Sequence, residues 1–375
     1  MPSPQELKEK LIAKAHELGF VLAGITTPDP TESYPRFESW ISAGYHAGMD
    51  WMASEHSLER RNDPQKIMPA CQSILMLGIP CLPSRPENSG IAAYALGDDY
   101  HDILPRRLEA LSRWLNEITG EEISSRWYTD TGPLLERDLA RRAGLGWIGK
   151  NSMLISPDGG GSYFLLAEIL LGIALPPDTP FAADHCGSCT RCLDACPTGC
   201  ILPGRTLDAN RCISYLTIEN KGGIPLELRP LIGEWQFGCD VCQQVCPWNR
   251  FSFSKVDPAF APREGVPPEN LAAEFSLTPQ AFNRKFKGSP VKRARRRGYL
   301  RNTAVVLGNG RGEDGIEGLS IALIDTEPLV RSHAAWALGQ IGGKQAVQLL
   351  RRALEVEAEA EVVGEIISAL ERNGG

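Results

Sequence analysis

The chain has 375 residues, of which 42% are hydrophobic and 23% charged, and its formal net charge at pH 7 is -7. These values are typical of a globular protein, exclude a long disordered region and, at roughly 100–200 residues per domain, predict two or three domains. Because the net charge is negative, any contact with nucleic acid must come from a local basic patch.

The first 20 residues predict an amphipathic helix and lack the apolar core of an export signal. One face of this helix would carry Leu7, Leu11, Ile12 and Ala15. The most apolar run, residues 163–176, is interrupted by Glu168 and is shorter than the ~20 residues of a membrane span. We therefore expect no membrane contact and a reducing, cytoplasmic location, where eleven cysteines indicate metal or redox chemistry rather than disulfides.

Three domains are expected in an α+β chain. Residues 1–175 alternate helical stretches with short apolar runs such as 73–80, which is typical of an α/β domain. A linker rich in proline and aspartate follows, and all but two of the cysteines lie beyond it, so we expect a ferredoxin-like, metal-organised domain over 176–255. The rest of the chain, from residue 270 to 375, is predicted to be helical.

The helical tail contains an internal repeat. Similar stretches occur at residues 299–309, 329–342 and 362–374. A leucine recurs at spacings of 31 and 32 residues, at Leu307, Leu338 and Leu370. This is the length of one helix pair, so we predict a short HEAT-like α-solenoid over 270–375, with an ordinary helical bundle as the alternative.

The cysteine spacing is that of a two-cluster ferredoxin. A first arm follows C-x2-C-x2-C-x3-C-P and consists of Cys186, Cys189, Cys192 and Cys196. A second arm follows C-x2-C-x3-C-P and consists of Cys239, Cys242 and Cys246. In this pattern the last cysteine of each arm binds the cluster of the other arm, which predicts two 4Fe–4S clusters.

The exchange assigns ligands to each cluster. Cluster 1 would be bound by Cys186, Cys189, Cys192 and Cys246. Cluster 2 would be bound by Cys196, Cys239, Cys242 and a fourth cysteine, either Cys200 or Cys212. We favour Cys212, because it lies in a separate segment that could close the site from another side.

Zinc is the alternative to iron and sulfur in this region. Zinc sites normally combine two cysteine pairs or a histidine, whereas here a third cysteine follows two residues after a pair. Cys71 and Cys81 lie near apolar runs and are expected to be buried thiols. No Rossmann or P-loop glycine motif is present, so the electrons must reach a cofactor that is held in another way.

Four stretches resemble the epoxyqueuosine reductase family: residues 128–151, the first cysteine arm, 212–222 and 237–249. The resemblance implies reduction of epoxyqueuosine to queuosine at the wobble position of tRNA, the last step of queuosine biosynthesis. It implies that an external one-electron donor feeds the two clusters and that the clusters feed a base-off cobalamin without a histidine ligand. The usual histidine-ligating pattern D-x-H-x-x-G is absent from this sequence.

The same resemblance implies site residues. Asp130, in the turn TDTGP, matches the proton donor, and its alternative role is to begin the following helix. The glycine-rich stretches 144–151 and 159–164 would let the backbone approach the corrin closely. The candidate cobalamin contacts are Arg61, Asp130, Gly149, Lys150, Asn151, Ser162 and Tyr163.

A basic stretch over residues 284–301 holds nine Lys or Arg residues and no acidic one. Phosphate contacts by such a patch would give strongly salt-dependent binding, and Phe286 and Tyr299 could stack on anticodon-loop bases. The candidate tRNA contacts are Lys292, Arg293, Arg295, Arg296, Arg297 and Arg301. The alternative is a solvated helix whose aromatic side chains face the solenoid core.

Two other functions remain open at this stage. One is a cobalamin-dependent reductase of a small molecule, similar to the reductive dehalogenases. The other is a ferredoxin-type electron carrier without a substrate pocket. In each case we expect a monomer, because no sequence feature indicates a symmetric interface.

Overall fold

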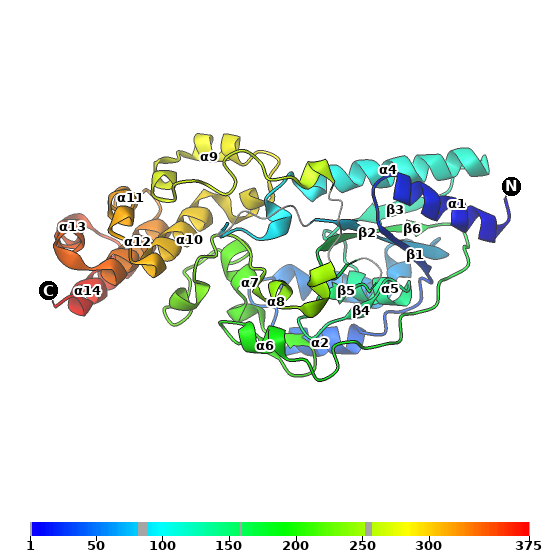
Figure 1. The fold of residues 1–375 in the computed structure, drawn as a ribbon, viewed down its shortest axis with the longest axis horizontal. Helices are drawn as coiled ribbons and strands as arrows, with labels where there is room; N and C mark the ends of the chain where they lie inside the picture. Colours follow the sequence, from blue (N-terminus) through cyan, green and yellow to red (C-terminus); the bar gives the residue numbers. More distant parts are fainter. Residues whose placement is uncertain (1, 82–88, 158–159, 252–256, 375) are drawn as a thin grey trace. The chain divides into compact units, whose positions relative to one another are not determined.

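The computed structural model describes residues 2–81, 89–157, 160–251 and 257–374, and the chain forms two compact units (Figure 1). The first unit is built from residues 1–84, 98–210 and 240–261, and the second from residues 85–97, 211–239 and 262–375. The segment expected as a middle domain therefore contributes to both units. The three-domain boundaries stay a prediction.

A four-stranded sheet is the centre of the first unit. Its strand order is β1 (Leu22–Thr26), β2 (Ser73–Pro80), β6 (Phe164–Leu171) and β3 (Ser125–Tyr128), and every pairing is antiparallel. Both apolar runs singled out in the sequence form strands of this sheet. The N-terminal part is thus of the α+β kind, with an antiparallel sheet in place of the parallel sheet that alternating helices and strands favour.

Helices cover both faces of the sheet (Figure 1). The packing partners of the sheet are α1 (Pro4–Glu17), α4 (Tyr100–Thr119) and α5 (Glu136–Arg142). Ile74 and Met76 of β2 share a core cluster with Leu139 of α5, and the alternate residues Leu75 and Leu77 are fully buried as well. Because successive strand residues point to opposite faces, β2 is buried on both sides.

The start of α1 follows from local chemistry. Ser3 and Glu6 form a capping box, in which the Ser3 hydroxyl accepts the Glu6 N–H and the Glu6 carboxylate accepts the Ser3 N–H. Pro4 occupies the first helical turn, where its missing N–H costs nothing. Leu7, Leu11 and Ala15 are buried, which confirms the predicted amphipathic helix.

The remaining elements of the first unit are short. They are α2 (Tyr34–Ser42), α3 (Glu55–Asn62), β4 (Trp147–Ile148), β5 (Leu154–Ile155), α6 (Arg191–Ala195), β7 (Ile201–Leu202), β8 (Thr206–Leu207) and α8 (Val241–Gln244). Helices α6 and α8 belong to the two cysteine arms and pack against each other. Among the described residues, no helix combines the length and apolar character needed to cross a membrane.

The second unit is helical. Its helices are α7 (Ile213–Ile218), α9 (Pro279–Lys285), α10 (Arg295–Gly310), α11 (Ile316–Ala322), α12 (Pro328–Ile341), α13 (Gly343–Val356) and α14 (Ala360–Arg372). Helices α10, α12 and α14, which carry the predicted repeats, pack in succession. A Cβ on Gly308 would lie 2.7 Å from the Trp336 ring, and one on Gly339 would lie 2.7 Å from Ala369 Cβ. These glycines occupy equivalent repeat positions and allow the helices to approach closely, as a solenoid requires.

Candidate functional site

Asp130 lies on a turn between β3 and α5, in the left-handed backbone conformation with φ of 60°. This conformation is uncommon for residues other than glycine and needs support from the surroundings. The Asp130 N–H donates to Glu136 Oε1 at 2.7 Å, and the Thr129 hydroxyl donates to the Leu166 carbonyl at 2.8 Å. Helix α5 begins only at Glu136, so the interpretation of Asp130 as a helix cap is wrong.

Two side chains at the start of α4 contact the Asp130 carboxylate. Tyr100 donates its hydroxyl to Asp130 Oδ2 at 2.9 Å, and His101 Nε2 lies 3.7 Å from the same oxygen. Asp99 caps α4 and accepts from the other ring nitrogen of His101 at 2.8 Å. The Asp130 side chain is 50% exposed, so its carboxyl group is open to a ligand.

The His101 imidazole is held in its charged form. Partial burial lowers its pKa, but the hydrogen bonds to Asp130 and then to Asp99 outweigh burial and raise the pKa of His101 to about 9. Near neutral pH, a proton-carrying imidazolium and a phenol therefore lie beside the Asp130 carboxyl group. A cluster of this kind can deliver protons to a reacting group. Tyr100 and His101 are not among the predicted site residues, although an Asp cap directly before a Tyr-His pair was a usable signal.

A buried carboxyl pair lies behind this turn. Glu168 of β6 is fully buried, and within the described part of the chain neither of its oxygens meets a hydrogen-bond partner. Burial, followed by the charges of Glu136 and Asp130, raises the pKa of Glu168 well above its usual value. Burial and the Asp130 charge also raise the pKa of Glu136 to about 7. Glu168 is thus kept protonated, and Glu136 titrates near physiological pH.

The predicted cobalamin contact Arg61 lies within electrostatic range of Glu136 and Asp130. Its side chain is buried, and its guanidinium donates to the Ser57 hydroxyl. Burial lowers the pKa of Arg61, whereas the charges of Glu136 and Asp130 counteract this effect. Arg61 therefore balances negative charge inside the protein.

Three other predicted cobalamin contacts hold the cysteine arms. Lys150 Nζ donates to the carbonyls of Gly187 and Cys189, at 2.7 and 2.9 Å. Asn151 is buried and donates to the Cys242 carbonyl at 3.4 Å. The Ser162 hydroxyl is buried and donates to Gln243 Oε1 at 2.9 Å.

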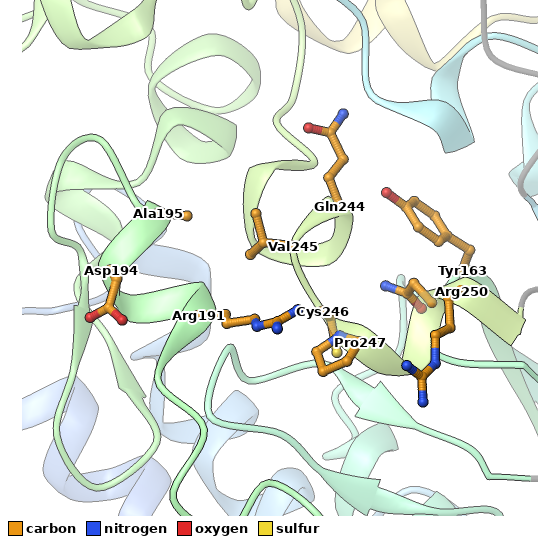
Figure 2. Close-up of a pocket in the computed structure, with 10 residues that line it drawn as sticks. Tyr163, Arg191, Asp194, Ala195, Gln244, Val245, Cys246, Pro247 and Arg250 are labelled. Atoms are coloured by element: carbon orange, nitrogen blue, oxygen red, sulfur yellow. The ribbon is translucent and has the colours of Figure 1, made fainter.

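The last two predicted cobalamin contacts, Gly149 and Tyr163, have different surroundings. Gly149 is enclosed, since a Cβ there would lie 2.6 Å from Ile155 Cδ1. Tyr163 lines a pocket of about 760 Å³ between the cysteine arms, together with Cys246 (Figure 2). The role of these residues as cobalamin contacts stays a prediction.

The thiols assigned to cluster 1 share one neighbourhood. Burial raises the pKa of Cys192, and the thiols Cys186, Cys246 and Cys189 raise it further. Burial likewise raises the pKa of Cys246, to which Cys186 and Cys189 add their charges. The last cysteine of the second arm therefore lies within electrostatic range of the first arm, which supports the predicted exchange. The donor set, four thiols, fits a 4Fe–4S cluster.

The ligands of cluster 2 are less defined. Cys196 Sγ lies 3.5 Å from Cys200 Sγ, so the alternative ligand Cys200 is directly beside the arm. Cys242 belongs to the first unit, whereas Cys212 and Cys239 belong to the second. In the described residues no three His, Cys, Asp or Glu side chains are placed to hold a single metal ion. The choice between Cys200 and Cys212 stays a prediction.

The cysteines outside the arms behave as expected. Cys71 and Cys81 are both buried, and burial raises the pKa of Cys71 to about 11. All eleven cysteines are outside disulfides. Cys71 and Cys81 are therefore packing residues with poorly ionised thiols.

The basic stretch is divided between surface and interior. Arg301 is fully buried, and its guanidinium donates to the carbonyls of Asn220, Gly222 and Leu216. Its prediction as a tRNA contact is wrong, because these hydrogen bonds fix a loop of the same unit. Arg296 pairs with Asp325, and Arg293 pairs with Glu219.

The exposed basic residues of the stretch are Arg284, Lys287, Lys292, Arg293 and Arg295, and Arg297 is half-buried. The two aromatic residues of the stretch, Phe286 and Tyr299, do not reach the protein surface. Phe286 and Tyr299 are fully buried and pack against each other, and Tyr299 donates to Glu274 at 2.7 Å. The predicted base stacking is therefore wrong, and the alternative, aromatic side chains in the helical core, is confirmed.

Comparison with known proteins decides the family. An epoxyqueuosine reductase of Xanthomonas campestris is 41% identical over 354 residues, which span 91% of this chain and 98% of the relative. The chain belongs to the epoxyqueuosine reductase family. The family model for epoxyqueuosine reductase QueG matches residues 61–131, a 4Fe–4S double cluster binding domain matches 185–249, and HEAT repeats match 296–371.

Solved structures of family members are similar over almost the whole chain. A crystal structure of epoxyqueuosine reductase with an epoxyqueuosine-modified tRNA-Tyr stem loop has a TM-score of 0.90 and 34% identity, and covers 99% of both chains. A Bacillus subtilis structure, whose catalytic aspartate loop is swung out of the active site, has a TM-score of 0.89 and 34% identity. It covers 98% of this chain and 99% of its own. The predicted α+β fold with a cluster-binding region and a HEAT-like tail is confirmed.

Proposed function

We propose that the chain is an oxidoreductase that reduces epoxyqueuosine to queuosine at the wobble position of tRNA. The observation that carries this proposal is the match, over almost the whole chain, to an epoxyqueuosine reductase solved with a modified tRNA stem loop. The exposed Asp130 carboxylate, with Tyr100 and His101 beside it, supplies the acid groups that the reaction needs. Conversion of the epoxide to an alkene and water consumes two electrons and two protons.

The electrons follow the cysteine arms in this proposal. The cysteine arms would hold the two 4Fe–4S clusters, which would carry electrons one at a time from an external donor to a bound cobalamin. When bound, the cobalamin supplies the reducing power that opens the epoxide. Two residues of the predicted cobalamin set, Asp130 and Tyr163, would lie next to the cobalamin. Asp130 is half-exposed, and Tyr163 lines the pocket beside Cys246.

In this proposal the protons come from the Asp130 cluster, which consists of Asp130, Tyr100 and His101. Asp130 protonates the epoxide oxygen as its carbon–oxygen bond breaks, and a second proton releases that oxygen as water. His101 returns a proton to Asp130 through their contact and is itself recharged from solvent. The aspartate-bearing catalytic loop of the Bacillus subtilis relative supports this role for a residue on an exposed turn. We further propose that the protein works as a monomer in the cytoplasm, where its tRNA substrate is made.

Substrate conversion tests the function directly. Anaerobically purified protein, loaded with iron and cobalamin, is expected to remove one oxygen atom from an anticodon stem loop carrying epoxyqueuosine, as measured by nucleoside mass spectrometry with a chemical reductant. The same stem loop carrying queuosine should remain unchanged. Reduction of a halogenated small molecule without conversion of the stem loop would favour the dehalogenase-like alternative. Clusters without either activity would favour an electron carrier.

The exposed part of the basic stretch is expected to bind the tRNA backbone. The double variant Lys292→Gln and Arg295→Gln should weaken stem-loop binding and reduce the slope of log affinity against log salt by about one for each residue. Both side chains are exposed, so their removal leaves the core intact. Fluorescence anisotropy at several salt concentrations measures the slope. The matched control, Lys344→Gln with Arg351→Gln, removes two exposed charges from α13 and should leave the slope unchanged. Equal effects of the two pairs would contradict a localised patch.

A further inference from the structure

The segment from Trp147 to Asn151 contacts the loop of the first cysteine arm at several points. Trp147 Nε1 donates to Cys186 Sγ at 3.5 Å. Three residues later, Lys150 Nζ donates to the carbonyls of Gly187 and Cys189 at 2.7 and 2.9 Å. One N–H donor and one cation, both from the same short segment, therefore lie at the loop that binds cluster 1.

The position of Trp147 is fixed by its neighbours. The side chain is 3% exposed and lies on β4, which pairs with β5. Two rings meet it edge-on, Trp248 at 4.9 Å and His185 at 5.0 Å between centroids, and Phe181 stacks on it at 5.8 Å. Because His185 directly precedes the first arm and Trp248 follows the second, both arms hold the indole in place. A donor held in this way keeps its direction toward the sulfur.

We propose that Trp147 and Lys150 set the reduction potential of cluster 1, by a hydrogen bond to the Cys186 sulfur and a positive charge on its loop. This inference rests on the proposed function, since it requires a loaded cluster. Reduction adds one negative charge to the cluster, and a donor or a cation beside a ligating sulfur stabilises that charge. Both residues therefore make the cluster easier to reduce, which favours transfer of electrons from the external donor.

The Trp147→Phe variant tests the hydrogen bond, because it keeps an aromatic ring and removes the N–H. We expect the equilibrium for one-electron reduction of cluster 1 to shift against reduction by about three- to tenfold, the effect of one net hydrogen bond. A tenfold shift corresponds to about 59 mV for one electron. The measurement is a redox titration of anaerobically loaded protein, followed by electron paramagnetic resonance, with the iron content determined on the same sample. An unchanged potential at full iron content overturns the role of Trp147.

A second variant makes the test independent of aromatic packing. Lys150→Met removes the charge from a half-buried side chain and is expected to shift the potential in the same direction. Trp51→Phe is the matched control, because Trp51 is 51% exposed. Cluster 1 of this variant should have the same reduction potential as cluster 1 of the unchanged protein. Unchanged potentials in both Trp147→Phe and Lys150→Met overturn the proposal, even if the enzyme converts its substrate. Failure of the proposed function is read separately, as loss of stem-loop conversion by the unchanged protein at full iron content.

Discussion

Replacement of Asp130 by asparagine is expected to lower kcat by about 10²–10⁴-fold, the usual contribution of a general acid. The asparagine side chain has the same shape and can still accept the hydrogen bond from Tyr100, but it cannot donate a carboxylic proton to the epoxide oxygen. Asparagine also tolerates the left-handed conformation at this position, so the turn should persist. Single-turnover conversion of the modified stem loop, started with pre-reduced enzyme, measures the effect on the chemical step.

The control for Asp130 is another acidic residue of the same unit. Asp102 is exposed on α4, and Asp102→Asn should convert the stem loop at the rate of the unchanged protein. The Asp130→Asn variant should also retain the iron content and the stem-loop affinity of the unchanged protein, because the contacts of Asp130 with Tyr100, His101 and Glu136 lie outside the cysteine arms and the basic stretch. Full activity of Asp130→Asn would remove this carboxyl from the proton path and leave His101 as the acid to be tested.

The sequence was sufficient where the chemistry depends on short-range spacing. The first arm places three cysteines within seven residues, so the possible ligands of one cluster could be identified without knowing the fold. The solenoid repeats were readable for a similar reason, because each helix pair buries the same kind of face at the same spacing. Gly308 and Gly339 show how strictly the repeat is kept, since each allows close approach to the next repeat helix.

The sequence was insufficient where the site depends on tertiary register. Glu168 becomes a neighbour of the Asp130 turn because β6 pairs with β3, which sets Tyr128 opposite Glu168. Its interruption of an apolar run was visible in the sequence, but the run alone could not show which acids would lie beside it. The start of α4 likewise reaches Asp130 only in the fold, through Tyr100 and His101.

The predicted binding residues depend on which side of a segment is buried and on what the segment approaches, and the sequence shows neither. A run of basic residues does not show which side of a helix is buried, and Arg301 lies on the buried side, where it binds backbone carbonyls. A glycine-rich segment likewise does not show which partner its backbone and side chains approach. Lys150 and Asn151 contact the cysteine arms, and this is the contact on which the proposed tuning of cluster 1 depends.

Replacement of Cys246 by alanine is expected to remove the same cluster as replacement of Cys186, although the two residues belong to different arms. The iron content should fall from about eight to about four per chain in both variants, and turnover should be lost because the electron path is interrupted. The reason is the predicted exchange of the last cysteine between arms, which is supported by the effect of Cys186 and Cys189 on the pKa of Cys246. Iron analysis and electron paramagnetic resonance of the reduced variants provide the measurement.

The spectra of these variants decide the assignment, because the iron content alone cannot identify the cluster that is lost. Cys246→Ala and Cys186→Ala should retain the same signal, that of cluster 2, whereas Cys242→Ala should retain the signal of cluster 1. The control Cys71→Ala changes a buried thiol outside both arms and should retain both clusters. If Cys246→Ala instead retained the signal seen in Cys242→Ala, the two residues would bind one cluster. Each arm would then bind its own cluster, and Trp147 would act on a cluster that Cys246 does not bind.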